Sequence, residues 1–113
     1  MKFVYIILCG IFLVPAAHAR TATASWYGAH WAGRHTANGE RFNPHAFTAA
    51  SKTLPMGTRL LVRRGSKSVV VRINDRGPYV NGRSLDLSHA AARRLGMVGK
   101  GVSKVQYTIL GSR

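Results

Sequence analysis

Acidic side chains are almost absent from this sequence. Only Glu40, Asp75 and Asp86 carry a carboxylate, against 17 Lys and Arg among 113 residues, and the formal net charge is +14. So large a positive charge attracts polyanions of many kinds, and nucleic acid is the usual partner of a strongly basic domain. Acids therefore do not serve solubility here, and each of the three is a candidate functional group.

Cysteine and long apolar runs are equally scarce. The one cysteine lies in an apolar run, Phe3–Val14, which follows Lys2 and precedes the small-residue pattern Ala17-His18-Ala19. A bilayer takes roughly 20 apolar residues to span, so this run is too short for a transmembrane anchor and is typical of a secretory signal peptide. We therefore predict that residues 1–19 are cleaved off after Ala19, that the protein is periplasmic or secreted, and that it is not a lipoprotein.

The predicted mature chain, residues 20–113, is one small domain. With 19 of its 113 residues removed it has 94 residues and no cysteine, and its formal charge falls from +14 to +13 because one lysine leaves with the signal peptide. A chain this short has room for one core, and it folds without disulfides although it is exported. Export makes nucleic acid a poor partner, so we expect none, and the phosphates and carboxylates of envelope polymers are better candidates. The alternative is a solvated basic surface with no dedicated ligand.

Local patterns predict an all-β domain. Alternating and β-branched residues indicate about six short strands, at residues 21–27, 47–50, 58–64, 67–74, 84–87 and 104–110. Val105, Tyr107 and Ile109 are expected to share one face of the last strand. An open sheet this small would leave long unpaired edges, so we expect a small closed barrel.

One short helix is predicted after the signal peptide. The alanine-rich segment 89–95 follows Ser88, a favoured N-cap residue, and carries arginines at its C-terminal end, where the helix dipole favours cations. Gly96 comes directly after it and is expected to end the helix.

The stretch from Asn74 to Ser88 carries most of the candidate chemistry. An apolar, β-branched run ends there in Asn74-Asp75-Arg76-Gly77-Pro78-Tyr79, which is typical of a strand entering a tight turn. The turn places the carboxylate of Asp75 beside the guanidinium of Arg76 at a strand end, where rigid scaffolds present functional groups. The alternative is that Asp75 only caps its own turn, as Asx residues do.

The other two acids also have structural alternatives. Asp86 could bond backbone groups near the helix start, and Glu40, which lies in a second turn, could pair with Arg34 or Arg41. If Asp75 and Asp86 share a cleft, the like charges raise the pKa of one of them. A raised pKa suits a carboxylic acid that donates a proton near neutral pH.

Aromatic residues near the first strand are candidates for a sugar-stacking platform, namely Trp26, Tyr27 and Trp31. The alternative is that Trp26 lies in the core and Trp31 packs over a barrel end. The histidines show no metal-ligand spacing, so we expect neither metal nor cofactor. Ser51 lacks a histidine partner at the spacing of a serine hydrolase.

Six motifs together resemble the rare lipoprotein A family. In chain order they read Ala24-Ser25-Trp26-Tyr27-Gly28, Thr36-Ala37-Asn38-Gly39-Glu40, Thr48-Ala49-Ala50, Lys52-Thr53-Leu54-Pro55, Val71-Arg72-Ile73-Asn74-Asp75-Arg76-Gly77-Pro78-Tyr79 and Leu85-Asp86-Leu87-Ser88-His89-Ala90-Ala91. They occur in the family's order over nearly the whole predicted mature chain. The resemblance implies a six-stranded double-psi β-barrel, a fold shared with the N-terminal domain of expansins. It also implies lytic transglycosylase activity on peptidoglycan, with a preference for glycan strands stripped of stem peptides.

The resemblance further implies the site residues. Glu40, Asp75 and Asp86 match the family's acidic positions and are predicted to be catalytic, in a cleavage of the MurNAc–GlcNAc bond that leaves 1,6-anhydro-MurNAc ends. The expected partner is the glycan strand, bound by a monomer. Substrate binding is assigned to five further residues, Tyr27, Trp31, Ser51, Arg76 and Tyr79.

One position departs from the family pattern. Ser51 stands where the family usually has a histidine that is counted among its active-site residues. This favours a second interpretation, a non-catalytic module that binds or loosens the wall like an expansin barrel. A third is a basic secreted effector or antimicrobial protein that targets anionic surfaces.

Overall fold

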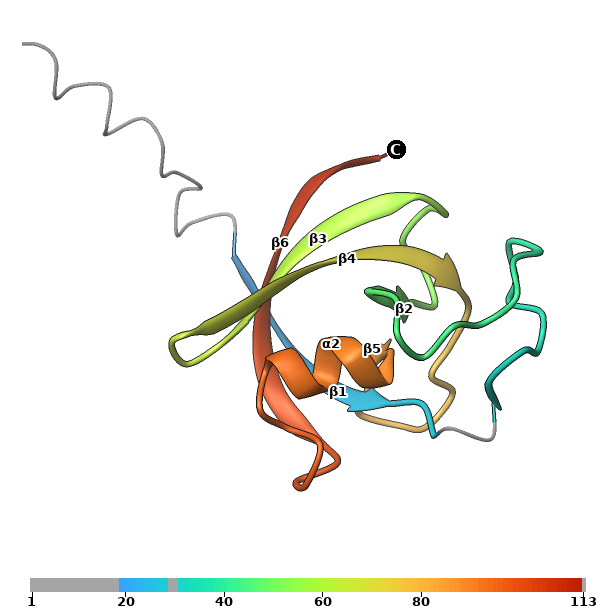
Figure 1. The fold of residues 1–113 in the computed structure, drawn as a ribbon. Coiled ribbons are helices and arrows are strands. Elements are labelled where there is room, and N and C mark those ends of the chain that lie inside the picture. Colours follow the sequence, from blue (N-terminus) through green and yellow to red (C-terminus); the bar gives the residue numbers. More distant parts are fainter. Residues whose placement is uncertain (1–18, 29–30, 113) are drawn as a thin grey trace, which may run out of the picture.

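Six strands close into a barrel in the order β1–β5–β2–β4–β3–β6 (Figure 1). This computed structural model describes residues 19–28 and 31–112, so the predicted signal segment lies outside the described residues. The expected closed all-β barrel with one short helix is confirmed. The elements are β1 (Arg20–Trp26), β2 (Thr48–Ala50), β3 (Thr58–Arg64), β4 (Lys67–Asp75), β5 (Leu85–Leu87), α2 (His89–Arg94) and β6 (Ser103–Ser112).

The barrel mixes parallel and antiparallel pairing. β1 pairs in parallel with β5, and β2 pairs in parallel with β4. β3 is antiparallel to both β4 and β6, and β1 is antiparallel to β6. The β3–β4 hairpin turns at Gly65 and Ser66, as predicted, because Gly65 supplies the positive φ of 62° that so tight a turn needs. Closure leaves no long bare sheet edge.

Alternate residues of the strands fill the barrel interior. Leu60 and Val62 of β3, Val71 and Ile73 of β4, and Leu87 of β5 are all buried to within 1% of full burial. Their neighbours along the strands are more exposed, which is the period-two pattern of a sheet with one buried face. The core therefore consists of the leucine and β-branched residues that alternate with more exposed residues along these strands.

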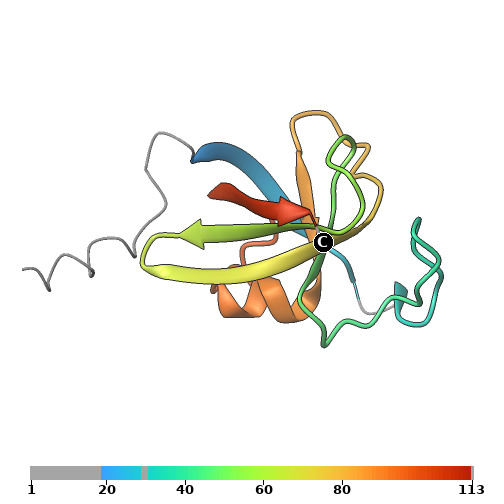
Figure 2. The same cartoon turned by 90° about the horizontal axis from the view of Figure 1, so that it is seen from above.

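Helix α2 packs against β1 and β4 on one side of the barrel (Figures 1 and 2). Ser88 is its N-cap, as predicted, and its Oγ accepts a hydrogen bond from the Ala91 N–H at 3.2 Å. Gly96 follows the helix with a φ of 70°, the conformation expected of the glycine that ends a helix. No helix in the described ranges is long and apolar enough to cross a membrane.

The last strand differs from its predicted pattern. Val105 is buried and Tyr107 half-buried, but Ile109 is 43% exposed while Thr108 is buried. The β3–β6 register shifts between Arg59 and Leu60, next to the position of Ile109. Beyond the shift β6 stays paired with β3, with Gly111 opposite Arg59 and Ser112 opposite Thr58.

Candidate active-site cleft

Two of the three acids lie in one row across neighbouring strands. Asp75 ends β4 and pairs with Ala50 of β2, and Ala50 pairs on its other side with Asp86 of β5. Asp86 in turn pairs with Ser25 of β1. Two strand spacings separate the Cα atoms of Asp75 and Asp86 by about 10 Å. Residues from two successive motifs thus come together, with only a small alanine between them.

This row opens into a cleft of about 390 Å³. The walls come from the end of β1, from the loop between β1 and β2, and from the turn after β4. These loops gather at one end of the barrel in Figure 1. The cleft is lined by Tyr27, Trp31, Arg34, His35, Thr36, Phe42, Asp75, Arg76, Gly77, Pro78, Tyr79 and Asp86.

The carboxylate of Asp75 is held by three donors. The N–H groups of Ala37 and Arg76 both donate to Oδ1 at 2.9 Å. The hydroxyl of Tyr27 donates to Oδ2 at 2.8 Å. Asp75 therefore caps its own turn, which was the alternative to a functional role. Its side chain also lines the cleft, in an orientation that these bonds fix.

Asp86 is the carboxyl group better suited to carry a proton. Burial raises the pKa of Asp86 above its ordinary value of 3.8, and the negative charge of Asp75 raises it further. The hydrogen bond that the Ser25 hydroxyl donates to Oδ1, at 3.0 Å, and the charge of Arg83 lower the pKa, but burial outweighs them. Asp86 therefore bonds a side chain of β1. The alternative, that it bonds backbone groups near the start of the helix, is not what the structure shows.

Aromatic rings form one wall of the cleft. Tyr27 stacks on the buried ring of Phe42 with centroids 4.6 Å apart and meets Trp31 edge-on at 6.5 Å. Trp31 is 41% exposed, and Tyr79, at 76%, stands at the rim. Trp26 is instead half-buried and packs against the core beside His89, outside the cleft lining. Exposed rings beside carboxylates give the cleft an apolar face and a polar edge.

The phenol of Tyr27 is a permanent donor. Burial raises the pKa of Tyr27 strongly, and the hydrogen bond to Asp75 adds to the effect. Its proton therefore stays on the oxygen throughout the physiological range. Tyr27 thus has two roles: its hydroxyl donates to Asp75, and its ring packs in the aromatic wall.

The guanidinium of Arg76 bonds the loop at Ser51 rather than the carboxylate of Asp75. The Arg76 guanidinium donates to the carbonyl oxygens of Ser51 at 3.0 Å and Leu54 at 2.7 Å. Ser51 is buried, and its Oγ accepts hydrogen bonds from the N–H groups of Thr53 and Leu54. Arg76 reaches the cleft lining, whereas Ser51 lies behind it. The hydroxyl at the family's histidine position is thus used to close a turn.

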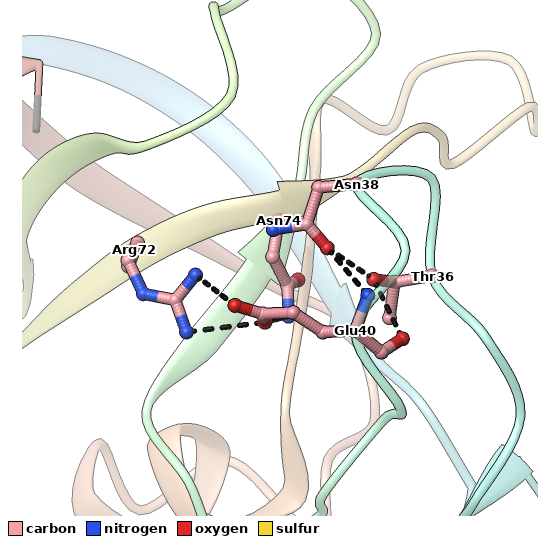
Figure 3. A network of polar contacts seen from close by, with 5 residues as sticks. All are labelled: Thr36, Asn38, Glu40, Arg72 and Asn74. Atoms are coloured by element: carbon pink, nitrogen blue, oxygen red, sulfur yellow. Dashed lines mark hydrogen bonds and ion pairs between the residues drawn. The ribbon is translucent and has the colours of Figure 1, made fainter.

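Glu40, the third acid, faces β4 outside the cleft lining (Figure 3). Arg72 of β4 forms a two-pronged pair with its carboxylate at 2.8 and 3.1 Å, and the amide of Asn74 donates to it at 2.9 Å. These bonds, that of Arg72 first, lower the pKa of Glu40 below 4.5. The alternative partners of Glu40 are wrong: Arg41 donates to the carbonyl of Gly33, and Arg34 lies over the ring of Trp31.

The Glu40–Arg72 pair latches the cleft loop onto β4. In Figure 3 the side chains of Thr36 and Asn38 lie beside Glu40, and Asn38 Oδ1 accepts from the Glu40 N–H at 3.1 Å. The N–H of Asn38 bonds the carbonyl of Asn74 at 3.2 Å. Between these anchors, the N–H of Ala37 points at Asp75. The latch therefore holds one of the three donors of Asp75 in place.

Four residues of the site were not among the predicted site residues. Arg72 and Ser25 belong to strands, and only the barrel order shows what their outward side chains meet. Arg34 and His35 lie in a loop whose path over the cleft no local pattern indicates. Within residues 19–28 and 31–112, no group of three His, Cys, Asp or Glu side chains is placed to hold a metal ion.

Solved structures with this fold establish the class of protein. The Streptomyces papain inhibitor superimposes with a TM-score of 0.68 at 20% identity, covering 87% of this chain and 99% of its own. The expansin of Clavibacter michiganensis has a TM-score of 0.68 at 19% identity, covering 84% of this chain and 52% of its own. At such identities the likeness shows the fold alone, and the chain is a double-psi β-barrel of the expansin type, as predicted.

The family follows from sequence comparison. A family model described as lytic transglycolase matches residues 19–107, and the chain belongs to this RlpA-like family of double-psi barrels. A Nostoc protein named probable endolytic peptidoglycan transglycosylase RlpA is 59% identical over 92 residues, 78% of this chain and 25% of its own. The Pasteurella multocida endolytic peptidoglycan transglycosylase RlpA is 46% identical over 97 residues, 84% of this chain and 33% of its own. The chain thus spans about a quarter to a third of the length of these relatives.

Proposed function

We propose that this protein cleaves peptidoglycan glycan strands by lytic transglycosylation in the cleft that holds Asp75 and Asp86. The observation that carries the proposal is the pairing of two unlike carboxyl groups in one row: Asp75 is fixed by three donors, and the pKa of Asp86 is raised. Different environments can give two neighbouring carboxyl groups different pKa values, and one group can then act as the acid while the other stays charged at the same pH. The named activity of the relatives supports the same chemistry.

The reaction needs one proton donor and no water. The protonated Asp86 gives its proton to the glycosidic oxygen while the bond from C1 of the MurNAc ring to that oxygen breaks. The ring's own C6 hydroxyl attacks C1, and the Asp86 carboxylate takes the hydroxyl proton, which restores the acid. The carboxylate of Asp75 faces the positive charge that develops on the ring, and the hydroxyl of Tyr27 holds this carboxylate in place.

The cleft and the N-terminal segment also suggest the substrate and the cellular location. Exposed Trp31 and Tyr79 offer stacking faces for sugar rings, while Arg34 lies against Trp31 with its guanidinium carbon 5.2 Å from the ring centroid. Stem peptides would crowd a cleft of about 390 Å³, which favours peptide-stripped glycan. We place the reaction in the periplasm or outside the cell, on the signal-like segment at residues 1–19, and assign it to a monomer.

A second candidate function is a non-catalytic wall-binding module. The observation that favours it is Ser51, which stands at the family's histidine position and is buried with its hydroxyl committed to a turn. Such a module would bind glycan through the same aromatic wall and release no fragments.

Digestion of purified, peptide-stripped glycan strands separates the two functions. The wild-type protein is expected to release muropeptides with 1,6-anhydro ends, detected by mass spectrometry as products one water lighter than their reducing counterparts. Release should be slower from peptide-bearing peptidoglycan. Binding without any fragment would establish the wall-binding module and overturn the proposed activity, and Ser51→His would then test whether the histidine restores cleavage.

Glu40 is expected to act by positioning the loop rather than by proton transfer. Glu40→Gln keeps acceptor and donor groups toward Arg72 and Asn74, so its kcat should stay within about tenfold of wild type, whereas loss of a general acid costs about 10²–10⁴-fold. Glu40→Ala removes the latch and displaces the donor of Asp75, and a misplacement of about 1 Å costs on the order of 10²-fold. Steady-state kinetics of both variants on glycan strands measure this difference.

The partner side of the latch provides the control. Arg72→Gln should lower kcat about as much as Glu40→Ala, and the double variant should be no worse than either single one, because both remove the same interaction. A Glu40→Gln variant as inactive as Glu40→Ala, beside an active Arg72→Gln, would show instead that the Glu40 carboxyl transfers a proton.

A further inference from the structure

A second concave surface lies at the opposite end of the barrel from the cleft. This basic groove, of about 340 Å³, is lined by Thr21, Arg63, Arg64, Gly65, Lys104, Val105 and Gln106. Thr21 is six residues before Tyr27, so about 20 Å of strand separates the groove from the cleft. In both ribbon views the β3–β4 hairpin, which carries Gly65, lies away from the cleft loops (Figures 1 and 2).

Register brings the polar side chains of the basic groove into one row. Gln106 of β6 pairs with Thr21 of β1 on one side and with Arg63 of β3 on the other. Because paired residues of a sheet point to the same face, and Val105 beside them points into the core, this row faces outward. Lys104, two residues before Gln106, lies on the same face. Three strands thus present two cations and two neutral donors to one hollow.

Two of the three cations that line the basic groove have no partner among the described residues. Arg63 and Lys104 are exposed, and neither makes a side-chain hydrogen bond or ion pair within the described part of the chain. Arg64 is different, since its guanidinium donates to Ser103 Oγ and to the carbonyls of Leu95 and Gly96. Its charge is therefore fixed in the groove wall.

No acid balances this charge. All three acids of the chain lie in or beside the cleft, at the far ends of β4 and β5 and in the loop held on β4. A hollow lined by charge of one sign concentrates the field and raises the local concentration of counter-ions. The ligand that fits is an anion with several acceptor oxygens.

We propose that the basic groove binds a phosphate-bearing segment of an anionic envelope polymer, at a site separate from the cleft. An arginine fork and a lysine point charge are the usual phosphate-binding pair. The hydroxyl of Thr21 and the amide of Gln106 add neutral donors, so that the four groups can engage several oxygens of one phosphate. Binding at this end would hold the domain on the envelope polymer while the cleft releases one glycan strand and binds the next.

The test compares two double variants of equal charge change. Arg63→Gln/Lys104→Gln removes the free cations of the basic groove. The matched control, Arg59→Gln/Lys52→Gln, removes one exposed arginine and one exposed lysine outside it. The probe is a short inorganic polyphosphate, titrated by calorimetry at several salt concentrations, with backbone amide NMR shifts to locate the bound probe.

The groove variant is expected to bind the polyphosphate at least tenfold more weakly than wild type. The slope of its log affinity against log salt should fall by about 2, one for each cation lost. The control should stay within twofold of wild type, and the amide shifts should centre on Thr21 and Gln106.

Three results would overturn the proposal. Equal weakening by both variants would show a diffuse charge effect, and shifts centred on the cleft would place the anion there. Tighter binding of a poly-glutamate of equal charge would exclude phosphate as the favoured group. None of these outcomes depends on glycan cleavage, so the basic groove stands or falls separately from the proposed activity.

Discussion

Replacement of Asp75 by asparagine is expected to slow glycan cleavage by about 10²–10⁴-fold while the barrel remains folded. The amide oxygen can keep the hydrogen bonds from the N–H groups of Ala37 and Arg76. The amide nitrogen can donate to the Tyr27 oxygen, which reverses the direction of that bond without moving the ring. What disappears is the negative charge that faces the developing oxocarbenium ion.

Anhydro-product formation by Asp75→Asn, beside wild type and Glu40→Gln, measures this effect. Glu40→Gln is the matched control because it makes the same carboxylate-to-amide change outside the cleft lining. Circular dichroism and the thermal midpoint Tm show whether the barrel is intact. Near-wild-type product from a folded Asp75→Asn protein would mean that Asp75 only caps its turn, since asparagine also serves in Asx turns.

Asp86→Asn is expected to abolish cleavage to a similar extent and, at the same time, to stabilise the fold at neutral pH. An amide cannot donate the proton that the leaving oxygen needs. Burial raises the pKa of Asp86, which means that holding its ionised form costs folding free energy. Removing the charge removes that cost, while the hydroxyl of Ser25 can still donate to the amide oxygen.

The pH dependence of this stabilisation has a definite sign. The folded state holds the Asp86 proton more tightly than the unfolded state, whose pKa is near the ordinary value of 3.8. Wild-type stability therefore falls as the pH rises from 3.8 through the raised folded pKa, and Asp86→Asn lacks this fall. Tm measured from pH 3 to pH 8 should show the variant gaining on wild type across this window. A variant less stable than wild type at pH 7 would show that Asp86 is there to hold the fold.

Much of the fold was predictable because its signals are local. The hairpin at Gly65, the cap at Ser88 and the stop at Gly96 each depend on residues within one turn of the chain. Barrel closure was predictable only from the need to cover edges. The strand order was not, because the parallel pairs β1–β5 and β2–β4 join segments far apart in sequence. Neither the exposure of Ile109 nor the extra residue beside it in β6, Leu110, had a signal in the sequence.

The candidate site was likewise predictable only in part. The concentration of Asp75 and Asp86 in adjacent motifs predicted a shared cleft, and both line it. Glu40 has an equally prominent motif but lies outside that lining, because its loop is drawn onto β4 by Arg72. Motif strength shows that a residue is constrained, whereas the barrel order decides whether its side chain meets the cleft or the scaffold that holds it.

The nature of the nucleophile tests the central claim most directly. Peptide-stripped glycan strands digested by the wild-type protein in heavy-oxygen water would be examined by mass spectrometry for their new ends. Attack by the ring's own C6 hydroxyl predicts 1,6-anhydro ends without heavy oxygen, formed by wild type and lost in Asp86→Asn. Reducing ends that carry heavy oxygen, or no new ends at all from the wild-type protein, would contradict lytic cleavage in this cleft.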